Sequence, residues 1–412
     1  MADAVLDPRP TGEMFDPTDA AYRRDPYPTY QRLLDAGRVH QSLFGGPVLV
    51  RHADCLAVLH HPQASSDETN STMYRQGVES GLISPDEEML ERRPFLFRDP
   101  PDHTRLRRLV SKAFTPRRIE ALRPRLIEIV DELLAPIEPG ATIDVIEDLA
   151  YPLPVQVICE LLGVPASDHP VFAEWSRYLA RSLDPDFLLS PDQVDAQRAA
   201  IDNFHQYFID LIAVRRNDLG DDLLSALIAA EEDGDRLNET ELHSTLVLLL
   251  VAGHETTVNL ITNGVHALLR NPDQRALVAA DDSLVPSLVE EVLRWDPPVQ
   301  IDGRTMMADV DIDGLPLAAG ETVLMLLAAA NRDPEVFDDP SRFDVTRTDN
   351  PHVSFGHGIH HCLGAALARA EGQVALGALI RRFPEWELAT DEVEYKENLV
   401  LRGLAALPVR FS

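Results

Sequence analysis

A helical pattern that runs from Glu239 to Arg270 constrains the fold of this chain more than any other feature. A helix of about 30 residues is roughly 45 Å long, which is enough to cross a protein of this size. Its apolar residues surround the helix instead of forming one stripe, as expected of an element that is buried on all sides. We therefore expect this helix to run through the core.

Helical patterning also dominates the rest of the 412 residues, and candidate strands are few and short. The other predicted helices are 27–36, 53–60, 103–114, 119–134, 155–162, 192–216, 223–230, 284–295 and 365–383. The predicted strands are 39–50, 306–312, 315–327 and 393–411. The sequence thus predicts a mainly α protein with a small, mostly antiparallel β portion. Because no linker or repeat marks a boundary, we expect residues 1–412 to form one domain.

Charge and hydropathy exclude several classes of protein. A formal net charge of −31 argues against nucleic-acid binding, because the chain as a whole would repel a phosphate backbone. The longest uninterrupted apolar run, 246–253, is far shorter than the roughly 20 residues that span a bilayer. The N-terminal residues include no signal-peptide apolar stretch, so we expect a cytoplasmic protein that does not associate with membranes.

One basic segment contrasts with this acidic background. Residues 92–125 carry eleven basic side chains against three acidic ones, a local net charge of +8 that leaves −39 for the rest of the chain. On a helical wheel of the predicted helix 103–114, both His103 and Arg107 lie beside the apolar arc. These two residues could therefore bind an enclosed anion.

The remaining basic residues of this segment point away from the apolar arc. They are Arg105, Arg108 and Lys112 on the same helix, followed by Arg117 and Arg118. Such a group forms either a docking surface for an acidic partner or an ordinary solvated face.

The three cysteines are widely separated and suit a reducing compartment rather than a disulfide framework. Cys55 and Cys159 lie among aliphatic residues and are predicted to be small buried hydrophobes. Cys362 instead ends a glycine-punctuated loop just before a predicted helix, whose amides would stabilise a thiolate. From the residues alone, Cys362 is a buried cysteine in a turn, a zinc ligand with the nearby histidines, or a haem ligand.

The loop around Cys362 resembles the cysteine-loop signature of the cytochrome P450 family, the haem-thiolate monooxygenases. The matching positions are Phe355-Gly356-x-Gly358-x-His360-x-Cys362-x-Gly364. Ala252-Gly-His-Glu-Thr-Thr257, in the long helix, is similar to the oxygen-binding groove of the family. Glu291-x-x-Arg294 resembles the family's buried ion network, which we expect Arg342 to complete. The implied fold has the long helix over the haem and the cysteine loop on the opposite face.

The resemblance also implies a set of site residues. Haem b would be held by Cys362 as the axial iron ligand, with Phe355, Ala252 and Gly253 against the cofactor. The haem propionates would be bound by His103, Arg107, Arg304 and His360.

Glu255 and Thr256 resemble the acid–alcohol pair that relays protons in this family. The alternative for the same two residues is structural, with Thr256 bonded to the carbonyl four residues earlier and Glu255 in an ion pair.

The activity implied is insertion of one atom of dioxygen into an apolar small molecule by hydroxylation or epoxidation. Electrons would come from a ferredoxin, fed by a NAD(P)H-dependent reductase and docked on the outward basic residues of a monomeric enzyme. A steroid or terpenoid, a fatty acid and a macrolide-type compound remain equally open as substrate. By family position the pocket includes the loop 69–96 and six further residues, namely Leu248, Val251, Val299, Gln300, Leu399 and Val400.

Three other functions remain open: a peroxygenase on the same fold, a haem-binding gas sensor and a zinc protein. The acid–alcohol pair counts against the peroxygenase, and the basic docking face counts against the sensor.

Overall fold

A computed structural model describes residues 12–85, 90–179, 181, 183, 184, 189–232 and 235–412. Part of the expected pocket loop, residues 86–89, lies outside the described residues. The helices are α1 Ala20–Arg24, α2 Tyr27–Ala36, α3 His52–His60, α4 Thr72–Glu79, α6 Asp102–Ala113, α7 Pro116–Leu134, α8 Pro152–Leu161, α9 His169–Leu179, α10 Pro191–Arg215, α11 Leu223–Ala229, α12 Glu239–Arg270, α13 Pro272–Ala280, α14 Val285–Trp295, α15 Leu327–Ala330 and α16 Ala365–Arg382. The strands are β1 Met14–Phe15, β2 Val39–Ser42, β3 Pro47–Leu49, β4 Ala64–Ser65, β5 Thr142–Asp144, β6 Glu231–Glu232, β7 Asp235–Arg236, β8 Ile301–Met306, β9 Val310–Ile312, β10 Leu315–Leu317, β11 Thr322–Leu326, β12 Trp386–Leu388 and β13 Pro408–Phe411.

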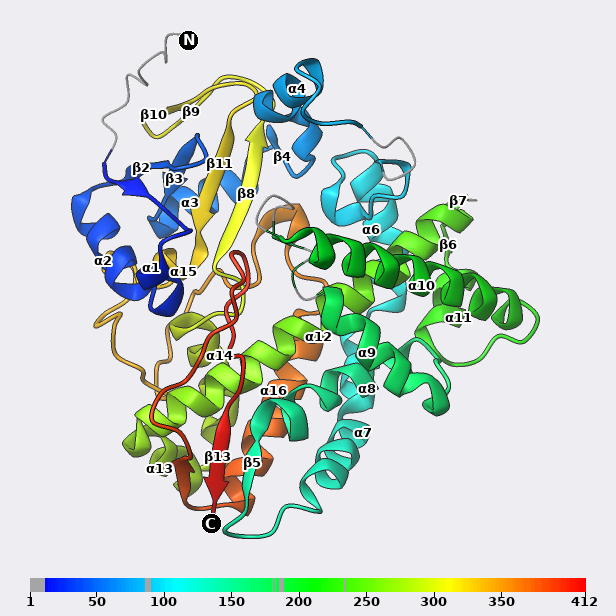
Figure 1. Ribbon diagram of the computed structural model, residues 1–412, viewed down its shortest axis with the longest axis vertical. Coiled ribbons are helices and arrows are strands. Elements are labelled where there is room, and N and C mark those ends of the chain that lie inside the picture. The colour runs from blue at the N-terminus through cyan, green and yellow to red at the C-terminus, as the bar shows by residue number, and fades with distance from the viewer. Residues whose placement is uncertain (1–11, 86–89, 180, 182, 185–188, 233–234) are drawn as a thin grey trace.

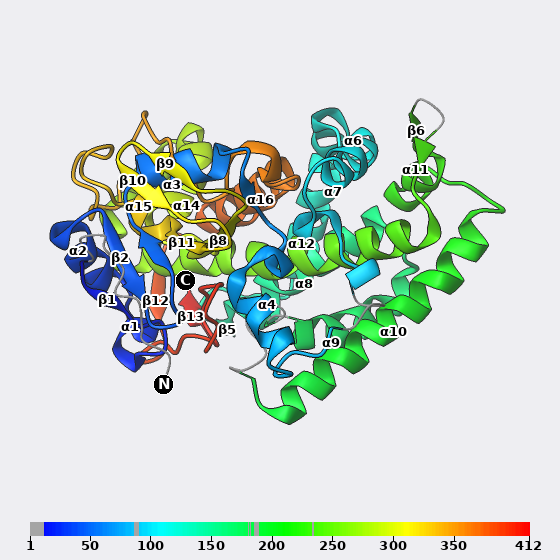
Figure 2. The same cartoon turned by 90° about the horizontal axis from the view of Figure 1, so that it is seen from above.

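The largest sheet and most of the helices occupy opposite sides of the molecule. The sheet has the strand order β1-β2-β3-β11-β8-β4, and it lies on the left in Figures 1 and 2, with α6, α7, α10 and α11 on the right. A smaller sheet has the order β12-β13-β5, and β9–β10 and β6–β7 form two-stranded sheets. The pairs β1–β2 and β3–β11 are parallel, and the other described pairs are antiparallel. The predicted mainly α class with a mostly antiparallel β portion is confirmed.

Helix α12 passes through the middle of the helical part, as the sequence predicts (Figure 1). Its 32 residues begin with a capping box, in which Asn238 and Glu241 each bond the other's backbone amide. By length and composition α12 could cross a membrane, but 67% of its most apolar stretch is buried inside the protein. This burial is typical of the core helix of a globular protein.

Helices α12 and α16 pack closely against each other in the core. A Cβ atom at Gly264 of α12 would lie 2.8 Å from a methyl carbon of Leu376, and one at Gly372 of α16 would lie 3.2 Å from Leu260. Leu260 and Leu376 are themselves buried. Glycine at these two positions therefore allows the two helices to approach each other closely.

A buried ion network connects α14 to the segment that precedes the cysteine loop. Arg294 donates to both carboxylate oxygens of Glu291, at 2.7 and 2.8 Å, and neither side chain is exposed. The same guanidinium donates to the carbonyls of Asn331, Pro340 and Arg342. The network thus holds together backbone segments that would otherwise leave buried carbonyl groups without donors.

The predicted role of Arg342 in this network is wrong. Its backbone carbonyl takes part, but its side chain is exposed. Arg347 supplies the second guanidinium, with Nε 3.3 Å from Glu291 Oε2. Arg342 and Arg347 both follow Pro340 closely in the sequence, so the sequence alone did not show which of the two side chains reaches Glu291.

All ten predicted helices agree with the structure to within three residues at each end, but five further helices among the described residues were missed. They are α1, α4, α9, α13 and α15. Helix α13 begins at Pro272, directly after the C-cap of α12, which hides its start in the sequence. Helices α1 and α15 are only 5 and 4 residues long, too short for a clear period.

The strand predictions were less accurate than the helix predictions. The predicted strand 306–312 spans two elements, because β8 ends at Met306 and β9 begins at Val310. In the predicted strand 393–411, regular pairing is confined to β13. One isolated bridge joins Leu401 to Val299, and another joins Tyr395 to Leu404 within the same segment. Short strands that pair with distant segments leave little local signal.

We predict that Glu291→Gln lowers the free energy of unfolding by about 3–5 kcal/mol, because it leaves the buried Arg294 without a counter-ion. Urea unfolding measures this change. The control is Arg381→Gln, which removes an ion pair with Asp282 whose side chains are 53% and 59% exposed, and it should cost less than about 1 kcal/mol. Equal, small losses in both variants would contradict the structural role of the network.

Candidate active site

The loop that ends at Cys362 folds tightly back on itself. Gly356 and Gly358 have φ angles of 63° and 67°, in the left-handed region that favours glycine. A Cβ atom at Gly358 would lie 2.3 Å from the carbonyl oxygen of Leu59, so the backbone itself contacts α3. The amide of Cys362 then donates to the carbonyl of Phe355, at 2.9 Å, and closes the loop. This geometry brings the thiol of Cys362 to an accessible position just before α16.

The electrostatic surroundings of Cys362 act in opposite directions. Desolvation by the surrounding protein atoms raises the pKa of the Cys362 thiol, although its surface remains accessible. The amides of Gly364 and Ala365 and the positive charges of Arg107 and Arg369 partly offset this effect, because each favours the thiolate. A metal cation at the sulfur would favour the thiolate further.

The other two cysteines are fully buried, as the sequence predicts. Burial raises the pKa of Cys55 well above its ordinary value, and it raises the pKa of Cys159 to about 12. Neither thiol is available as a ligand, so Cys362 is the candidate metal-binding cysteine.

An ion network fixes the start of the cysteine loop against α14 and α16. The guanidinium of Arg369 lies over the ring of Phe355, 4.5 Å from its centroid, and donates to both oxygens of Glu290. His352 also contacts Glu290, at 3.1 Å. Burial alone would raise the pKa of Glu290, but the hydrogen bonds from His352 and Arg369 outweigh it and lower this pKa to about 2.

Four residues from three segments form a group that is rich in hydrogen-bond donors. They are His103 and Arg107 of α6, Arg304 of β8 and His360 of the cysteine loop. The rings of His103 and His360 lie 4.1 Å apart, and neither nitrogen of the buried His103 has a partner. His360 contacts Ser66 through Nε2, whereas its buried Nδ1 has no partner. Burial and the charge of Arg107 lower the pKa of His103 to about 4. Burial and the charges of His103 and Arg304 lower the pKa of His360 to about 3.

Besides burial, the positive charges of Arg107 and Arg304 lower the pKa values of both histidines, because they repel a further positive charge. Arg304 donates to Asp302 and to the carbonyl of Gly303, and Arg107 donates to the carbonyl of His361. Buried polar nitrogens without partners are costly, so the group is suited to an anion such as a carboxylate. The four predicted propionate-binding residues, His103, Arg107, Arg304 and His360, are thus brought close to the cysteine loop.

The middle of α12 is accessible, although most of the helix is buried. Ala252 is exposed and Gly253 and Thr256 are half-buried, whereas Leu250 and Val258 on either side are fully buried. Small side chains therefore leave open space beside an otherwise buried helix. Such a site can accept a flat cofactor and a small molecule.

Glu255 and Thr256 make the contacts of the structural alternative. The hydroxyl of Thr256 donates to the carbonyl of Ala252, at 2.9 Å. Glu255 is buried, and its Oε1 lies 2.6 Å from Nζ of Lys396, on the C-terminal segment. In a proton relay through these residues, Thr256 would start with its hydroxyl hydrogen donated to Ala252, and Glu255 would start paired with Lys396.

A buried carboxyl group ties the cysteine-loop helix to this part of α12. Burial raises the pKa of Glu371 of α16 to about 8, and the hydroxyl of Thr257, the residue after Thr256, offsets this effect only in part. That hydroxyl itself donates to the carbonyl of Gly253, at 3.2 Å. Oε2 of Glu371 has no partner. Because α16 begins three residues after Cys362, this contact links the position of the cysteine to that of Thr256.

The residues expected to line a substrate pocket divide into two groups. Leu248 and Val251 are half-buried on α12, within one turn of Ala252, and Val299, Leu399 and Val400 are also half-buried. Gln300 differs, because its Oε1 accepts from Tyr30 at 2.9 Å and its Nε2 donates to the carbonyl of Pro297 at 2.7 Å. Gln300 is only 3% exposed, so its amide has a structural role.

Four of the five residues of the predicted docking surface are exposed at the junction of α6 and α7. These are Arg108, Lys112, Arg117 and Arg118. Arg105 differs from the prediction, because it is half-buried and forms ion pairs with Asp235 and Glu241. The helical wheel placed Arg105 outward correctly, but the contact with the segment 235–241 has no local signal.

The histidines near Cys362 do not converge on one point, as a zinc site would require. His357 pairs with His60 at 2.6 Å, His352 with Glu290, and His360 with Ser66. Among the described residues, no three His, Cys, Asp or Glu side chains are grouped so that they could hold a metal ion.

Sequence reasoning missed three charged residues near the site: Lys396, Asp184 and Glu371. A single carboxylate among the small apolar residues of α16 was a signal for Glu371. Lys396 and Asp184 lie in irregular segments, where the sequence has no periodicity from which to place a side chain.

Comparison with known proteins agrees with this arrangement. The family model described as "Cytochrome P450" matches residues 58–411. The chain is 44% identical over 404 residues to the vitamin D(3) 25-hydroxylase of Pseudonocardia autotrophica, covering 96% of each protein. It is 45% identical over 315 residues to the 6-deoxyerythronolide B hydroxylase of Saccharopolyspora erythraea, covering 76% of each.

A solved structure is similar over nearly the whole chain. It is ligand-free CYP164A2 of Mycobacterium smegmatis, with 46% identity and a TM-score of 0.85, and the match covers 96% of this chain and 98% of that one. With the family model and the relatives, this similarity shows the family as well as the fold. The chain belongs to the bacterial cytochromes P450, haem b-dependent oxidoreductases that incorporate oxygen from dioxygen into their substrates.

Proposed function

We propose that this protein is a haem-thiolate monooxygenase that hydroxylates or epoxidises an apolar small molecule, with electrons supplied by a ferredoxin. The observation that carries the proposal is the accessible stretch of α12 at Ala252 and Thr256, together with the accessible thiol of Cys362 and the unpaired donors of His103 and His360. A monomeric enzyme in the cytoplasm is part of the same proposal.

The residues present fit haem b. Cys362 would ligate the iron, and the buried nitrogens without partners on His103 and His360, with Arg107 and Arg304, would bind the two carboxylates of the porphyrin. The small residues Ala252 and Gly253 would leave room for it beside α12. Bound haem supplies the redox chemistry that activates dioxygen.

The protein contributes the supply of protons. Thr256 donates its own hydrogen to the carbonyl of Ala252, which leaves the lone pairs of its oxygen free to accept a hydrogen bond from a water molecule. Glu255 is the nearest carboxylate in sequence, one residue away on the same helix. We assign Glu255 to proton supply and Thr256 to proton positioning.

The substrate pocket in this proposal is aliphatic. Leu248, Val251, Val299, Leu399 and Val400 are half-buried and contribute no charge, which favours an apolar substrate. Two relatives are named for hydroxylation of vitamin D(3) and of 6-deoxyerythronolide B. A steroid-like or macrolide-type substrate fits both observations, and a fatty acid is the remaining candidate.

The redox partner in this proposal docks on Arg108, Lys112, Arg117 and Arg118. These residues are exposed in a chain with a net charge of −31, so a small acidic protein is attracted to this surface and repelled elsewhere. Arg105 is excluded from the surface, because it is paired with Asp235 and Glu241.

Oxygen labelling tests the proposed function. The holoenzyme, with a ferredoxin, its reductase and NAD(P)H, is given ¹⁸O₂ and a panel of steroids, macrolides and fatty acids. We expect one ¹⁸O atom in the product. Turnover with hydrogen peroxide alone, and none with the electron-transfer proteins, would instead identify a peroxygenase, and no turnover under either condition would favour a sensor.

We predict that Thr256→Ala separates electron consumption from product formation, because the proton-positioning hydroxyl is lost. The product formed per NAD(P)H should fall by about tenfold or more, with hydrogen peroxide released instead. The matched control is Thr262→Ala, since Thr262 donates to the carbonyl of Val258 on the same helix and is fully buried. Unchanged coupling in Thr256→Ala would refute the relay.

We predict that the double variant Arg108→Glu/Lys112→Glu weakens ferredoxin binding by about tenfold or more and reduces its dependence on salt. Titration of the holoenzyme with ferredoxin measures both effects. The control is Arg381→Glu/Arg410→Glu, which reverses two exposed charges, one near the C-terminal end of α16 and one on β13. Strand β13 lies at the end of the molecule away from α6 in Figure 1. Equal effects in both double variants would mean that only net charge matters and would exclude this docking surface.

A further inference from the structure

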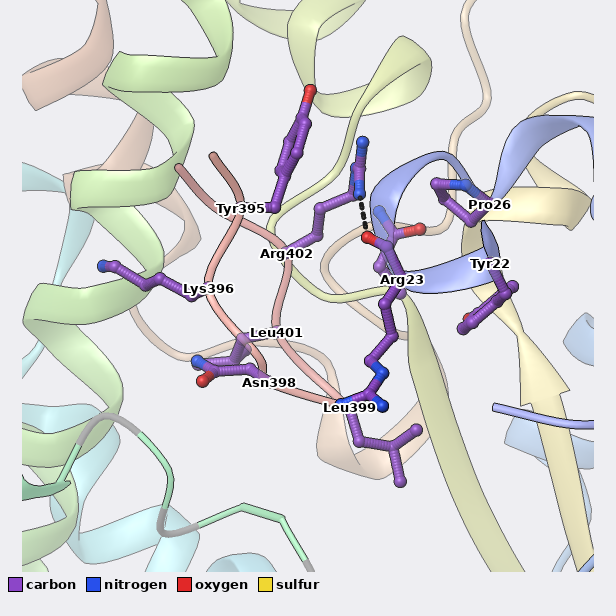
Figure 3. A pocket seen from close by; sticks show the side chains of 10 residues that line it. Tyr22, Arg23, Pro26, Tyr395, Lys396, Asn398, Leu399, Leu401 and Arg402 are labelled. Carbon is purple, nitrogen blue, oxygen red and sulfur yellow. Dashed lines mark hydrogen bonds between the residues drawn. The ribbon is translucent and has the colours of Figure 1, made fainter. Parts of the chain in front are cut away.

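Lys396 holds the carboxylate that the proposed relay needs. Its Nζ lies 2.6 Å from Oε1 of Glu255, whose side chain is only 4% exposed, whereas the side chain of Lys396 is 23% exposed. Figure 3 shows Lys396 pointing away from the other labelled side chains, toward α12. A buried carboxylate needs such a partner, and here the partner belongs to a segment 141 residues away.

The same segment borders the proposed substrate pocket. We call residues 396–403 the C-terminal tip, because the chain turns back within it and the amide of Lys396 donates to the carbonyl of Gly403. The amides of Leu399 and Val400 both donate to Oδ1 of Asp184, at 2.9 and 3.1 Å. Asp184 is buried, and its Oδ2 accepts from Arg181.

The C-terminal tip is therefore fixed at two points. One is Glu255, on the helix that lines the haem site, and the other is Asp184, after α9. The pocket residues Leu399 and Val400 make the contact with Asp184 through their own amides, and they follow Lys396 by three and four residues. A substrate that displaces Leu399 or Val400 would therefore also disturb the contact between Lys396 and Glu255.

We propose that Lys396 is a positioning residue for proton supply: it holds Glu255, and through the C-terminal tip it couples substrate contact to that acid. This inference rests on the proposed function of Glu255. Lys396 acts through Glu255, so it is a positioning residue and not a catalytic one.

Lysine suits this role, and the sequence uses it sparingly. Only two of the 37 basic residues counted as Lys and Arg are lysines, Lys112 and Lys396. An ammonium group on a flexible stem can leave and re-form a single contact, whereas a guanidinium favours a fixed, two-pronged pairing. Partial exposure of Lys396 gives it access to solvent when it leaves Glu255.

The other charged or titratable groups around the pair do not change charge near neutral pH. Burial lowers the pKa of His254 and raises that of Tyr151 to about 12, so both are neutral there. Arg177 is paired with Glu147 through two hydrogen bonds, and its partnership lowers the pKa of Glu147. Lys396 is therefore the cation in direct contact with Glu255, and Arg177 acts on Glu255 through its charge without a hydrogen bond to it.

The first experiment compares Lys396→Met with Lys396→Arg in the holoenzyme. Loss of the cation favours protonated Glu255, so the pH profile of product formed per NAD(P)H in Lys396→Met should move upward by about one unit or more. Lys396→Arg restores the charge and should restore most of the profile. An unmoved profile in Lys396→Met would overturn the proposal.

The second experiment does not depend on turnover. Reductive ¹³C-methylation of the holoenzyme keeps the lysine charges and labels two lysines and the α-amine. The Lys396 signal, identified by its loss in Lys396→Arg, should move in Glu255→Gln and in Asp184→Ala, while the Lys112 signal stays fixed. A Lys396 signal that moves in neither variant, or in Glu255→Gln alone, would overturn the coupling.

The outcome for Thr256→Ala separates this inference from the function on which it rests. If Thr256→Ala leaves coupling intact, the relay itself fails. If Thr256→Ala uncouples the enzyme but Lys396→Met keeps the wild-type pH profile, the relay stands and only the role of Lys396 fails.

Discussion

The close packing of α12 against α16 is the constraint on which the rest of the site depends. Gly264 and Gly372 remove the side chains that would separate the two helices, and Glu371 of α16 interacts with Thr257 of α12 across their contact. Because α16 begins three residues after Cys362, the packing of the core also sets the distance between the cysteine and the accessible stretch of α12. A change in the helix contact would move both sides of the cofactor site at once, so core packing and chemistry are not independent in this fold.

The two histidines of the site are less well satisfied than the buried pair Glu291 and Arg294. Arg294 and Glu291 form a saturated, fully buried network, whereas His103 and His360 carry buried nitrogens without partners. Both patterns have a physical rationale. The first fixes the backbone that leads to the cysteine loop, and the second keeps donors free for an anion, at a cost that binding of haem would offset. The lowered pKa values of His103 and His360 reflect the same lack of partners and the nearby positive charge.

Much of this account follows from the sequence, and the rest needed the structure for identifiable reasons. The helix Glu239–Arg270 and the left-handed glycines of the cysteine loop follow from periodicity and glycine spacing. The pairings of Arg105, Arg347 and Lys396 do not, because each joins segments that are close only in the folded chain. Short strands such as β5 and β12 were missed for the same reason. Local patterns predict elements and motifs, but long-range ion pairs depend on tertiary packing.

The most direct test of the central claim is the absorption spectrum of the dithionite-reduced protein under carbon monoxide, for wild type, Cys362→Ala and Cys159→Ala. Thiolate ligation by Cys362 predicts a strongly red-shifted Soret band in the wild type and in Cys159→Ala, whose cysteine is buried, and its absence in Cys362→Ala. A wild-type spectrum typical of imidazole ligation, or a red-shifted band that persists in Cys362→Ala, would contradict the assignment of Cys362 as the haem ligand.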